Sequence, residues 1–276
     1  MTRTKSWVVP CCLLLFSAGA QQRASDGDVA EIIFLDVGQG DAAIVRSPEG
    51  KVALVDSGRD AGILESLRRH GIDSIDIAIA SHPHADHIGG MEAVIRSLPV
   101  RYYMDNGVPH ATATYRGLLR TLQQSDVTYL QATSRTINLG SVKLTVLPPL
   151  GGTDNLNNGS IGLRVTYGDF SALLTGDSEI DELNHFMSQG VSQVTVLKAA
   201  HHGSRDAVSP AWLYATKPDV VVISCGRENP YGYPNPWALR YYETVASKVY
   251  RTDLDGDVTI AAAFDGSVDV STQLRR

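Results

Sequence analysis

One short segment of the chain carries a dense set of side chains that can bind metal ions. Residues 82–87 read His-Pro-His-Ala-Asp-His, so three imidazoles and one carboxylate lie within six positions. The apolar run 77–80 precedes this segment and a Gly-Gly pair follows it soon after, which is typical of a loop that leaves a buried strand. Such a loop directs His82 and His84 at one centre and Asp86 and His87 at a neighbouring centre. The segment therefore predicts two metal ions held side by side.

A later carboxylate is placed to share those ions. Asp177 follows the apolar run 170–174, and an acidic group at the end of a buried strand is costly unless it is paired or bound to metal. We expect Asp177 to bridge the two ions. The alternative is that Asp177 caps a helix ahead of Glu179.

Two adjacent histidines are candidates for the last ligand. His201 and His202 follow the predicted strand 193–198. We expect His201 to complete the second ion's site and His202 to face the substrate or support the site. A hydrogen-bonded structural role is the alternative for this pair.

The remaining sequence reads as strands followed by alternating strands and helices, with no break in composition that would mark a linker. The first three strands should form an antiparallel meander. The expected strands cover residues 31–36, 42–46, 51–56, 76–80, 100–104, 127–130, 141–147, 161–167, 170–174, 193–198 and 219–224, with a final hairpin over 257–272. The expected helices cover residues 60–70, 90–97, 113–124, 178–188, 209–215 and 236–246. Two β-rich halves flanked by helices predict one α/β domain, a four-layer sandwich whose strand ends meet along one edge.

The N-terminus has the composition of a secretory signal peptide. Arg3 and Lys5 precede a 14-residue apolar stretch that ends in Ala18-Gly19-Ala20. We expect residues 1–20 to be removed and residues 21–276 to form the mature, secreted or periplasmic domain, without a stable membrane span. An uncleaved helix is the weaker interpretation, because a span needs about 20 apolar residues. Lipidation at Cys11 or Cys12 is disfavoured, because most of the apolar stretch follows them.

Charge and cysteine content limit the partners of the mature chain. The full chain has a formal net charge of −6, and removal of two basic residues leaves 22 Lys and Arg against 30 Asp and Glu, a charge of −8. An acidic protein has no general attraction to phosphate backbones, so a nucleic-acid substrate needs a local binding patch. Only Cys225 would remain after cleavage, so an internal disulfide is excluded in the mature form.

Two further motifs favour other chemistry at first sight. Residues 38–43 match the dinucleotide pattern GxGxxA, but a strand is expected at 42–46, where a pyrophosphate site requires a helix. Residues 253–257 resemble the start of a calcium loop, but Phe264 occupies the twelfth position, where that loop has glutamate. A tight Asp-Gly turn between strands is the better interpretation.

Taken together, several motifs in order resemble the metallo-β-lactamase superfamily, and more closely the hydrolase domain of the ComEC competence family. The resemblance covers residues 31–262 and rests on the segments 34–42, 54–58, 81–90, 157–160, 174–177, 197–204 and 250–253. It implies an αββα sandwich with a first ion on His82 and His84 and a second ion on Asp86, His87 and His201. Asp177 would be shared, and Asp56 would orient the histidine loop by hydrogen bonds.

Two positions depart from these families. Most superfamily members with two ions have a further histidine upstream of the bridging aspartate, where this chain has Asn157, Asn158 and Ser160. The first ion therefore has an open position or a weak ligand. His110 is a candidate to approach it from a loop, and the alternative for His110 is a pocket or surface role. Tyr233 stands where the ComEC-like pattern has histidine. The role of that histidine passes to Tyr233 or is lost.

The resemblance and the ligand set together predict a metal-dependent hydrolase, foremost a phosphodiesterase or nuclease with two zinc or manganese ions. Asp86 or Asp177 would orient the attacking hydroxide. Lys198, His202 and Ser204 are the candidates for holding the scissile group, with Arg205 less favoured. The substrate would be a nucleic acid or a cell-envelope phosphodiester. The alternatives are a β-lactamase or lactonase, and a non-catalytic metal-binding partner of an envelope or DNA-uptake machine.

Overall fold

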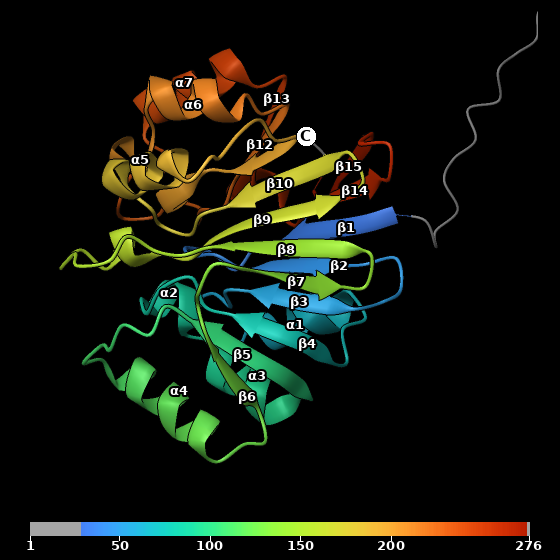
Figure 1. The fold of residues 1–276 in the computed structure, drawn as a ribbon, viewed down its shortest axis with the longest axis vertical. Coiled ribbons are helices and arrows are strands. Elements are labelled where there is room, and N and C mark those ends of the chain that lie inside the picture. The colour runs from blue at the N-terminus through green and yellow to red at the C-terminus, as the bar shows by residue number, and fades with distance from the viewer. Residues whose placement is uncertain (1–28, 275–276) are drawn as a thin grey trace, which may run out of the picture.

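The computed structural model describes residues 29–274, and the predicted signal peptide lies outside them (Figure 1). The helices are α1 (Ile63–Arg69), α2 (Ala85–Ile88), α3 (Met91–Ser97), α4 (Ala113–Gln123), α5 (Ile180–Ser188), α6 (Pro210–Thr216), α7 (Pro236–Val245) and α8 (Thr252–Asp255). Short 3-10 turns cover Asn157–Gly159, Ala200–Gly203 and Arg205–Ala207. No helix within residues 29–274 combines the length and the apolar character needed to cross a membrane.

An eight-stranded mixed sheet forms the first half. Its order is β15-β14-β1-β2-β3-β4-β5-β6. The strands are β1 (Val29–Phe34), β2 (Ala43–Arg46), β3 (Val52–Val55), β4 (Ile75–Ile79), β5 (Val100–Asp105), β6 (Thr128–Gln131), β14 (Val258–Ala263) and β15 (Val268–Thr272). Strands β1, β2 and β3 pair antiparallel, which confirms the predicted meander, and β3 to β6 run parallel.

A seven-stranded sheet forms the second half, in the order β13-β12-β11-β10-β9-β8-β7. Its strands are β7 (Arg135–Leu139), β8 (Val142–Leu147), β9 (Gly162–Tyr167), β10 (Phe170–Leu174), β11 (Val196–Lys198), β12 (Val220–Ile223) and β13 (Lys248–Arg251). The hairpin of β9 and β10 is present as predicted, and β10 to β13 run parallel. In Figure 1, α2 after β4 and α5 after β10 lie at the same end of the two sheets.

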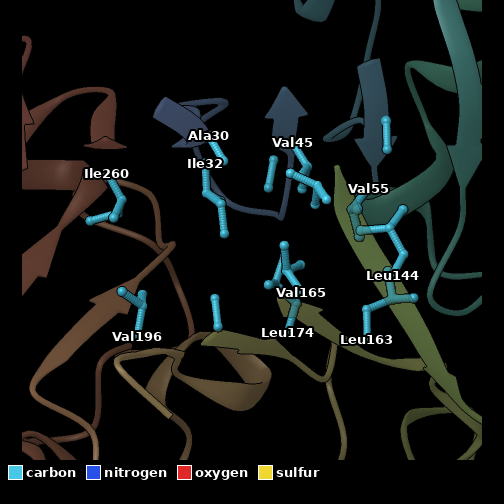
Figure 2. Close-up of a cluster of buried hydrophobic side chains, with 14 of the residues drawn as sticks. Ala30, Ile32, Val45, Val55, Leu144, Leu163, Val165, Leu174, Val196 and Ile260 are labelled. Carbon is cyan, nitrogen blue, oxygen red and sulfur yellow. The ribbon is translucent and has the colours of Figure 1, made fainter. Parts of the chain in front are cut away.

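Three buried hydrophobic clusters hold these layers together. The central cluster joins the inner faces of both sheets, with Ile32 and Val45 from one sheet opposite Val165 and Leu174 from the other (Figure 2). A second cluster packs α1, α3 and α4 on the outer face of the first sheet. A third packs α5, α6 and α7 on the outer face of the second sheet. The molecule is thus the four-layer αββα sandwich that the sequence predicted.

The structure corrects several details of the prediction, among them the helical turn α2, which carries Asp86 and His87 where a loop was expected. Strands β7 and β13 were not expected, and residues 252–255 form the single helical turn α8 instead of part of a tight turn between paired strands. Strand β2 begins at Ala43, which confirms that no helix follows the GxGxxA motif.

Candidate metal centre

Asp56 fixes the histidine loop at the end of β4. One of its carboxylate oxygens accepts the backbone N–H of Ser81 at 2.7 Å, and the other accepts the Ser81 hydroxyl at 2.8 Å. The second oxygen also lies 2.9 Å from Nδ1 of His87. Asp56 itself has a φ of 59°, in the left-handed region that few non-glycine residues adopt. These hydrogen bonds are the orienting contacts that the family resemblance implies for Asp56.

The first donor cluster joins the histidine loop to the second half of the molecule. His82, His84 and Asp177 each offer one ligand atom to a common centre. Nε2 of His82 lies 2.9 Å from Nδ1 of His84 and 3.8 Å from Oδ2 of Asp177. Ligands held about 2.0–2.1 Å from a tetrahedral ion lie roughly 3.3 Å apart, so these spacings suit one ion with a fourth position left open.

The second donor cluster adjoins the first through Asp177. It contains Asp86, His87 and His202. Nε2 of His202 lies 3.5 Å from Oδ2 of Asp86 and 3.5 Å from Oδ2 of Asp177, and Nε2 of His87 lies 3.1 Å from the same Asp177 oxygen. Asp177 therefore lies between the two clusters, in the place expected of a bridging ligand.

Unpaired buried atoms support a metal at this place. Nε2 of His87, Nε2 of His202 and Oδ1 of Asp177 are buried and make no hydrogen bond of good geometry, although Oδ2 of Asp177 lies 3.1 Å and 3.5 Å from the two nitrogens. Buried polar atoms are normally paired, so three convergent exceptions call for a bound group. The opposite nitrogens are occupied: Nδ1 of His87 bonds Asp56, and Nδ1 of His202 lies 3.0 Å from the carbonyl oxygen of Ser224. This arrangement leaves Nε2 of each ring free for an ion.

His202, rather than His201, completes the second cluster. Nε2 of His201 is 3.9 Å from Asp177, and its Nδ1 is 3.6 Å from Glu179. The Tyr233 hydroxyl lies 3.5 Å from Nε2 of His201. Both histidines have left-handed backbones, with φ of 48° and 53°, a strain that is typical of functional sites. This geometry favours His202 as the ligand and places His201 beside the cluster with Tyr233.

Substitution of the two histidines should separate these roles. We expect His202→Ala to lose about one bound metal ion per chain, because it removes a buried ligand between Asp86 and Asp177. His201→Ala is the matched control and should keep the wild-type metal content. Metal analysis after dialysis measures both. If His201→Ala loses an ion and His202→Ala keeps the wild-type content, His201 is the ligand, as expected from the sequence.

Asp41 is a functional residue that the sequence interpretation missed. Its Oδ1 lies 3.2 Å from Nδ1 of His202, and its Oδ2 lies 2.5 Å from Nζ of Lys198. The Lys198 ammonium is buried and also donates to the carbonyl oxygen of Ala199 at 3.0 Å. Lys198 is therefore unavailable to hold a scissile group, which corrects that expectation: it fixes Asp41, and Asp41 orients His202. The sequence signal for Asp41 was the segment 38–41, Gly-Gln-Gly-Asp, which is among the segments that carry the family resemblance.

Ser204 and Arg205 have local partners. Ser204 is buried, and its hydroxyl oxygen accepts the backbone N–H of Asp206 at 3.3 Å. The guanidinium of Arg205 lies over the Trp237 ring at 5.5 Å. The structure thus gives Ser204 a capping role in place of the expected contact with a scissile group.

The polar residues that replace the family's upstream histidine serve the start of α5. Oδ1 of Asn158 accepts the backbone N–H groups of Glu179 at 3.0 Å and Glu182 at 3.4 Å. The Ser160 hydroxyl accepts the backbone N–H of Asp177 at 3.2 Å. Asn158 and Ser160 therefore position the Asp177 segment instead of adding a ligand to the first cluster.

Asn157 and His110 are the remaining candidates for the open side of the first cluster. Nδ2 of Asn157 donates to Glu179 at 2.8 Å, and its Oδ1 is buried without a partner. The His110 ring lies 5.9 Å from the His84 ring, measured between centroids. His110 thus borders the first cluster, from the loop after β5, without belonging to its ligand set.

Opposite charges decide which groups of the centre stay ionised. Burial lowers the pKa of His82 well below its usual range, which leaves the neutral imidazole that binds metal. Burial opposes charge on Asp177, but His202 and His87 outweigh it and hold its pKa well below the usual range. Burial also opposes charge on these two imidazoles, yet Asp177 and its neighbouring carboxylates raise their pKa well above the usual value. Metal binding at His87 and His202 would therefore release protons.

The fold and this centre define a class of protein. The model of the metallo-beta-lactamase superfamily matches residues 35–227, and the chain belongs to that superfamily. Among curated proteins it is 29% identical to Recombination protein 2 of Haemophilus influenzae, over 82% of this chain and 28% of that protein. It is 25% identical to ComE operon protein 3 of Bacillus subtilis, over 90% of this chain and 35% of that protein. The likeness to competence proteins is confirmed, and the chain spans about a third of their length.

Solved structures show the same fold. The metallo-beta-lactamase fold protein YhfI of Bacillus subtilis matches with a TM-score of 0.56 and 14% identity, over 84% of this chain and all of that protein. Tm1679, described as a metal-dependent hydrolase of the beta-lactamase superfamily, matches with a TM-score of 0.55 and 17% identity, over 88% of this chain and all of that protein. At this identity the two structures support the fold alone.

Proposed function

We propose that this chain is an exported, metal-dependent phosphodiesterase that acts on a nucleic acid or a cell-envelope phosphodiester. The observation that carries the proposal is the pair of adjoining donor clusters that share Asp177. Export rests on the signal-peptide pattern of residues 1–20.

The residues present suit two divalent ions, zinc or manganese. His82, His84 and Asp177 would hold the first, and Asp86, His87, His202 and Asp177 would hold the second. When bound, such ions supply a nucleophilic water at neutral pH and offset charge on a phosphoryl oxygen.

Two parts of the chain would act directly on the substrate. The side chain of Asp86 is 18% exposed, compared with 4% for Asp177, so Asp86 is the ligand carboxylate that an incoming water reaches first. It would orient that water and hold its proton. His201 and the Tyr233 hydroxyl lie together beside the second cluster, where they would donate hydrogen bonds to a non-bridging phosphate oxygen.

Two observations support a diester over a β-lactam. The curated relatives include competence proteins, among them Competence protein ComA of Neisseria gonorrhoeae, 29% identical over 90% of this chain and 35% of that protein. In addition, Asn158 and Ser160 form hydrogen bonds that position the Asp177 segment, and they supply no ligand to the first cluster. That cluster therefore has three donors and a side that is open for substrate.

The deciding experiment is an activity panel on the mature protein loaded with Zn²⁺ or Mn²⁺. We expect hydrolysis of bis(p-nitrophenyl) phosphate with at least one of the metals, little turnover of the monoester p-nitrophenyl phosphate, and none of the β-lactam nitrocefin. Cleavage of the monoester without the diester would overturn the proposal. Turnover of nitrocefin alone would assign the centre to β-lactam hydrolysis.

A further inference from the structure

We propose that Tyr231 and Tyr233 form a platform on which a nucleobase of the substrate stacks beside the second donor cluster. This inference rests on the proposed phosphodiesterase function and narrows its substrate to diesters that carry a planar base. Both tyrosines lie in the loop between β12 and α7.

The platform is a nearly parallel pair of rings, of which Tyr231 is exposed. The ring centroids of Tyr231 and Tyr233 are 5.6 Å apart and their planes differ by 17°. Tyr231 is 57% exposed, and the ring that it packs on, Tyr233, contacts both His201 and His202. An exposed aromatic face stacks on any base, because every base has a flat π-surface.

Tyr233 connects the platform to the metal ligands. Its ring lies 5.4 Å from the ring of His201 and 6.1 Å from the ring of His202, the latter at 33°. A base on the outer face of Tyr231 is therefore separated from the ring of His202 by both tyrosine rings. A nucleotide on the platform would have its phosphate near the Tyr233 hydroxyl, which lies 3.5 Å from Nε2 of His201.

Ring contacts also link the histidines of the two donor clusters to each other and to His110. Each of these pairs is in ring contact, with centroid distances of 5.4 Å for His202 and His87, 4.2 Å for His87 and His82, 4.6 Å for His82 and His84, and 5.9 Å for His84 and His110. The platform is thus next to the second cluster and His110 is next to the first. We expect a chain substrate that lies across both clusters to meet the platform on one side of its scissile bond.

The loop that carries the platform is held in shape by Asn229. Its Oδ1 accepts the backbone N–H of Tyr233 at 2.9 Å, and its Nδ2 donates to the carbonyl oxygens of Gly226 at 2.8 Å and Tyr233 at 2.7 Å. A loop that is already ordered loses little conformational freedom when a base binds. Little of the free energy of base stacking is therefore offset by the cost of ordering the loop.

The negative net charge of the chain makes base stacking more important for substrate binding. With a formal net charge of −6, the protein has no overall attraction for a polyanion. Two arginines of this region have partners within the protein: Arg205 lies over Trp237, and Arg227, in the same loop, donates to the carbonyl oxygen of Asp253 at 3.2 Å. Base stacking adds an attraction that does not depend on charge.

A pair of small diesters tests the platform. Thymidine 5′-(p-nitrophenyl phosphate) and methyl p-nitrophenyl phosphate share the leaving group and differ in the base. We expect Tyr231→Ala to raise KM for the thymidine ester about 10-fold, the effect of losing one stacked base. Its kcat/KM for the methyl ester should stay within about twofold of wild type. Tyr231→Phe keeps the ring and should restore the low KM.

A second exposed tyrosine provides the matched control. Tyr214 is 75% exposed on α6, and its ring lies over Lys217 at 4.7 Å. Tyr214→Ala should leave KM and kcat/KM for both esters unchanged. Equal KM increases for both esters in Tyr231→Ala, or no increase for either, would overturn the platform.

Binding separates this inference from the proposed hydrolysis. Fluorescence anisotropy compares a short oligothymidylate with an abasic strand of the same phosphate count. Tyr231→Ala should weaken binding of the oligothymidylate about 10-fold and leave the abasic strand unchanged, whether or not either strand is cleaved. If wild-type protein binds both strands equally, the platform is excluded even where diester hydrolysis holds.

Discussion

Asp177→Asn is expected to abolish diester hydrolysis and to lower metal content. The substitution keeps the size of the side chain but removes the negative charge that lies 3.1 Å from His87, 3.5 Å from His202 and 3.8 Å from His82. Loss of a residue that merely supports a ligand typically costs 10- to 100-fold in metal affinity or activity. A ligand shared by both clusters should therefore cost more than about 100-fold in kcat/KM, with less than the wild-type amount of metal retained.

The control for Asp177 is a carboxylate of equal burial elsewhere. Asp257 is also 4% exposed and pairs with Arg69 at 3.1 Å and His70 at 2.8 Å, outside the donor clusters. Asp257→Asn should lower stability while metal content and kcat/KM stay close to wild type. Steady-state kinetics and metal analysis measure both variants. Full metal content and activity in Asp177→Asn would contradict its place at the centre.

Lys198→Met should be the most destabilising single change near the site. It leaves the Asp41 carboxylate buried without its 2.5 Å partner, and breaking a buried ion pair from one side costs about 3–5 kcal/mol. The double variant Asp41→Asn with Lys198→Met removes both charges and should regain most of that loss. Urea unfolding of metal-free protein measures the free energy of unfolding for each.

An exposed ion pair shows what burial contributes. Lys51 lies 3.2 Å from Asp76, with side chains 53% and 29% exposed. Lys51→Met should change the free energy of unfolding by less than about 1 kcal/mol, because water screens the pair. If Lys198→Met costs no more than Lys51→Met, the Lys198 ammonium is not the partner that keeps Asp41 charged.

The part of the centre that is local in sequence could be predicted, and the part that depends on long-range contacts could not. The segment 82–87 is a motif in itself, and Asp177 follows an apolar strand at a position where a free carboxylate would be unstable. The choice between His201 and His202 depends on which imidazole Asp41 and Asp86 contact. Likewise, Lys198 resembles a substrate-binding cation until its partner Asp41, from the other sheet's half, is known.

Among the strands, the two that were not predicted lie at the edges of one sheet. Both unexpected strands, β7 and β13, are the outermost strands of the seven-stranded sheet. An edge strand is paired on one side only and tolerates polar residues, so it lacks the apolar run that marks an interior strand. Strand β7 reads Arg-Thr-Ile-Asn-Leu and has one buried residue, Leu139. The interior strands β10 and β12, which are fully buried, were placed within two residues of their ends.

The division of the donor clusters between the two halves links folding to metal binding. The histidine loop belongs to the first sheet's half, whereas Asp177 and His202 follow strands of the second, so each ion would be held by both. An ion that binds only the assembled sandwich adds its binding free energy to the stability of the whole. The metal centre would then hold the two halves of the sandwich together, and the protein would be more stable where metal is plentiful than where it is scarce.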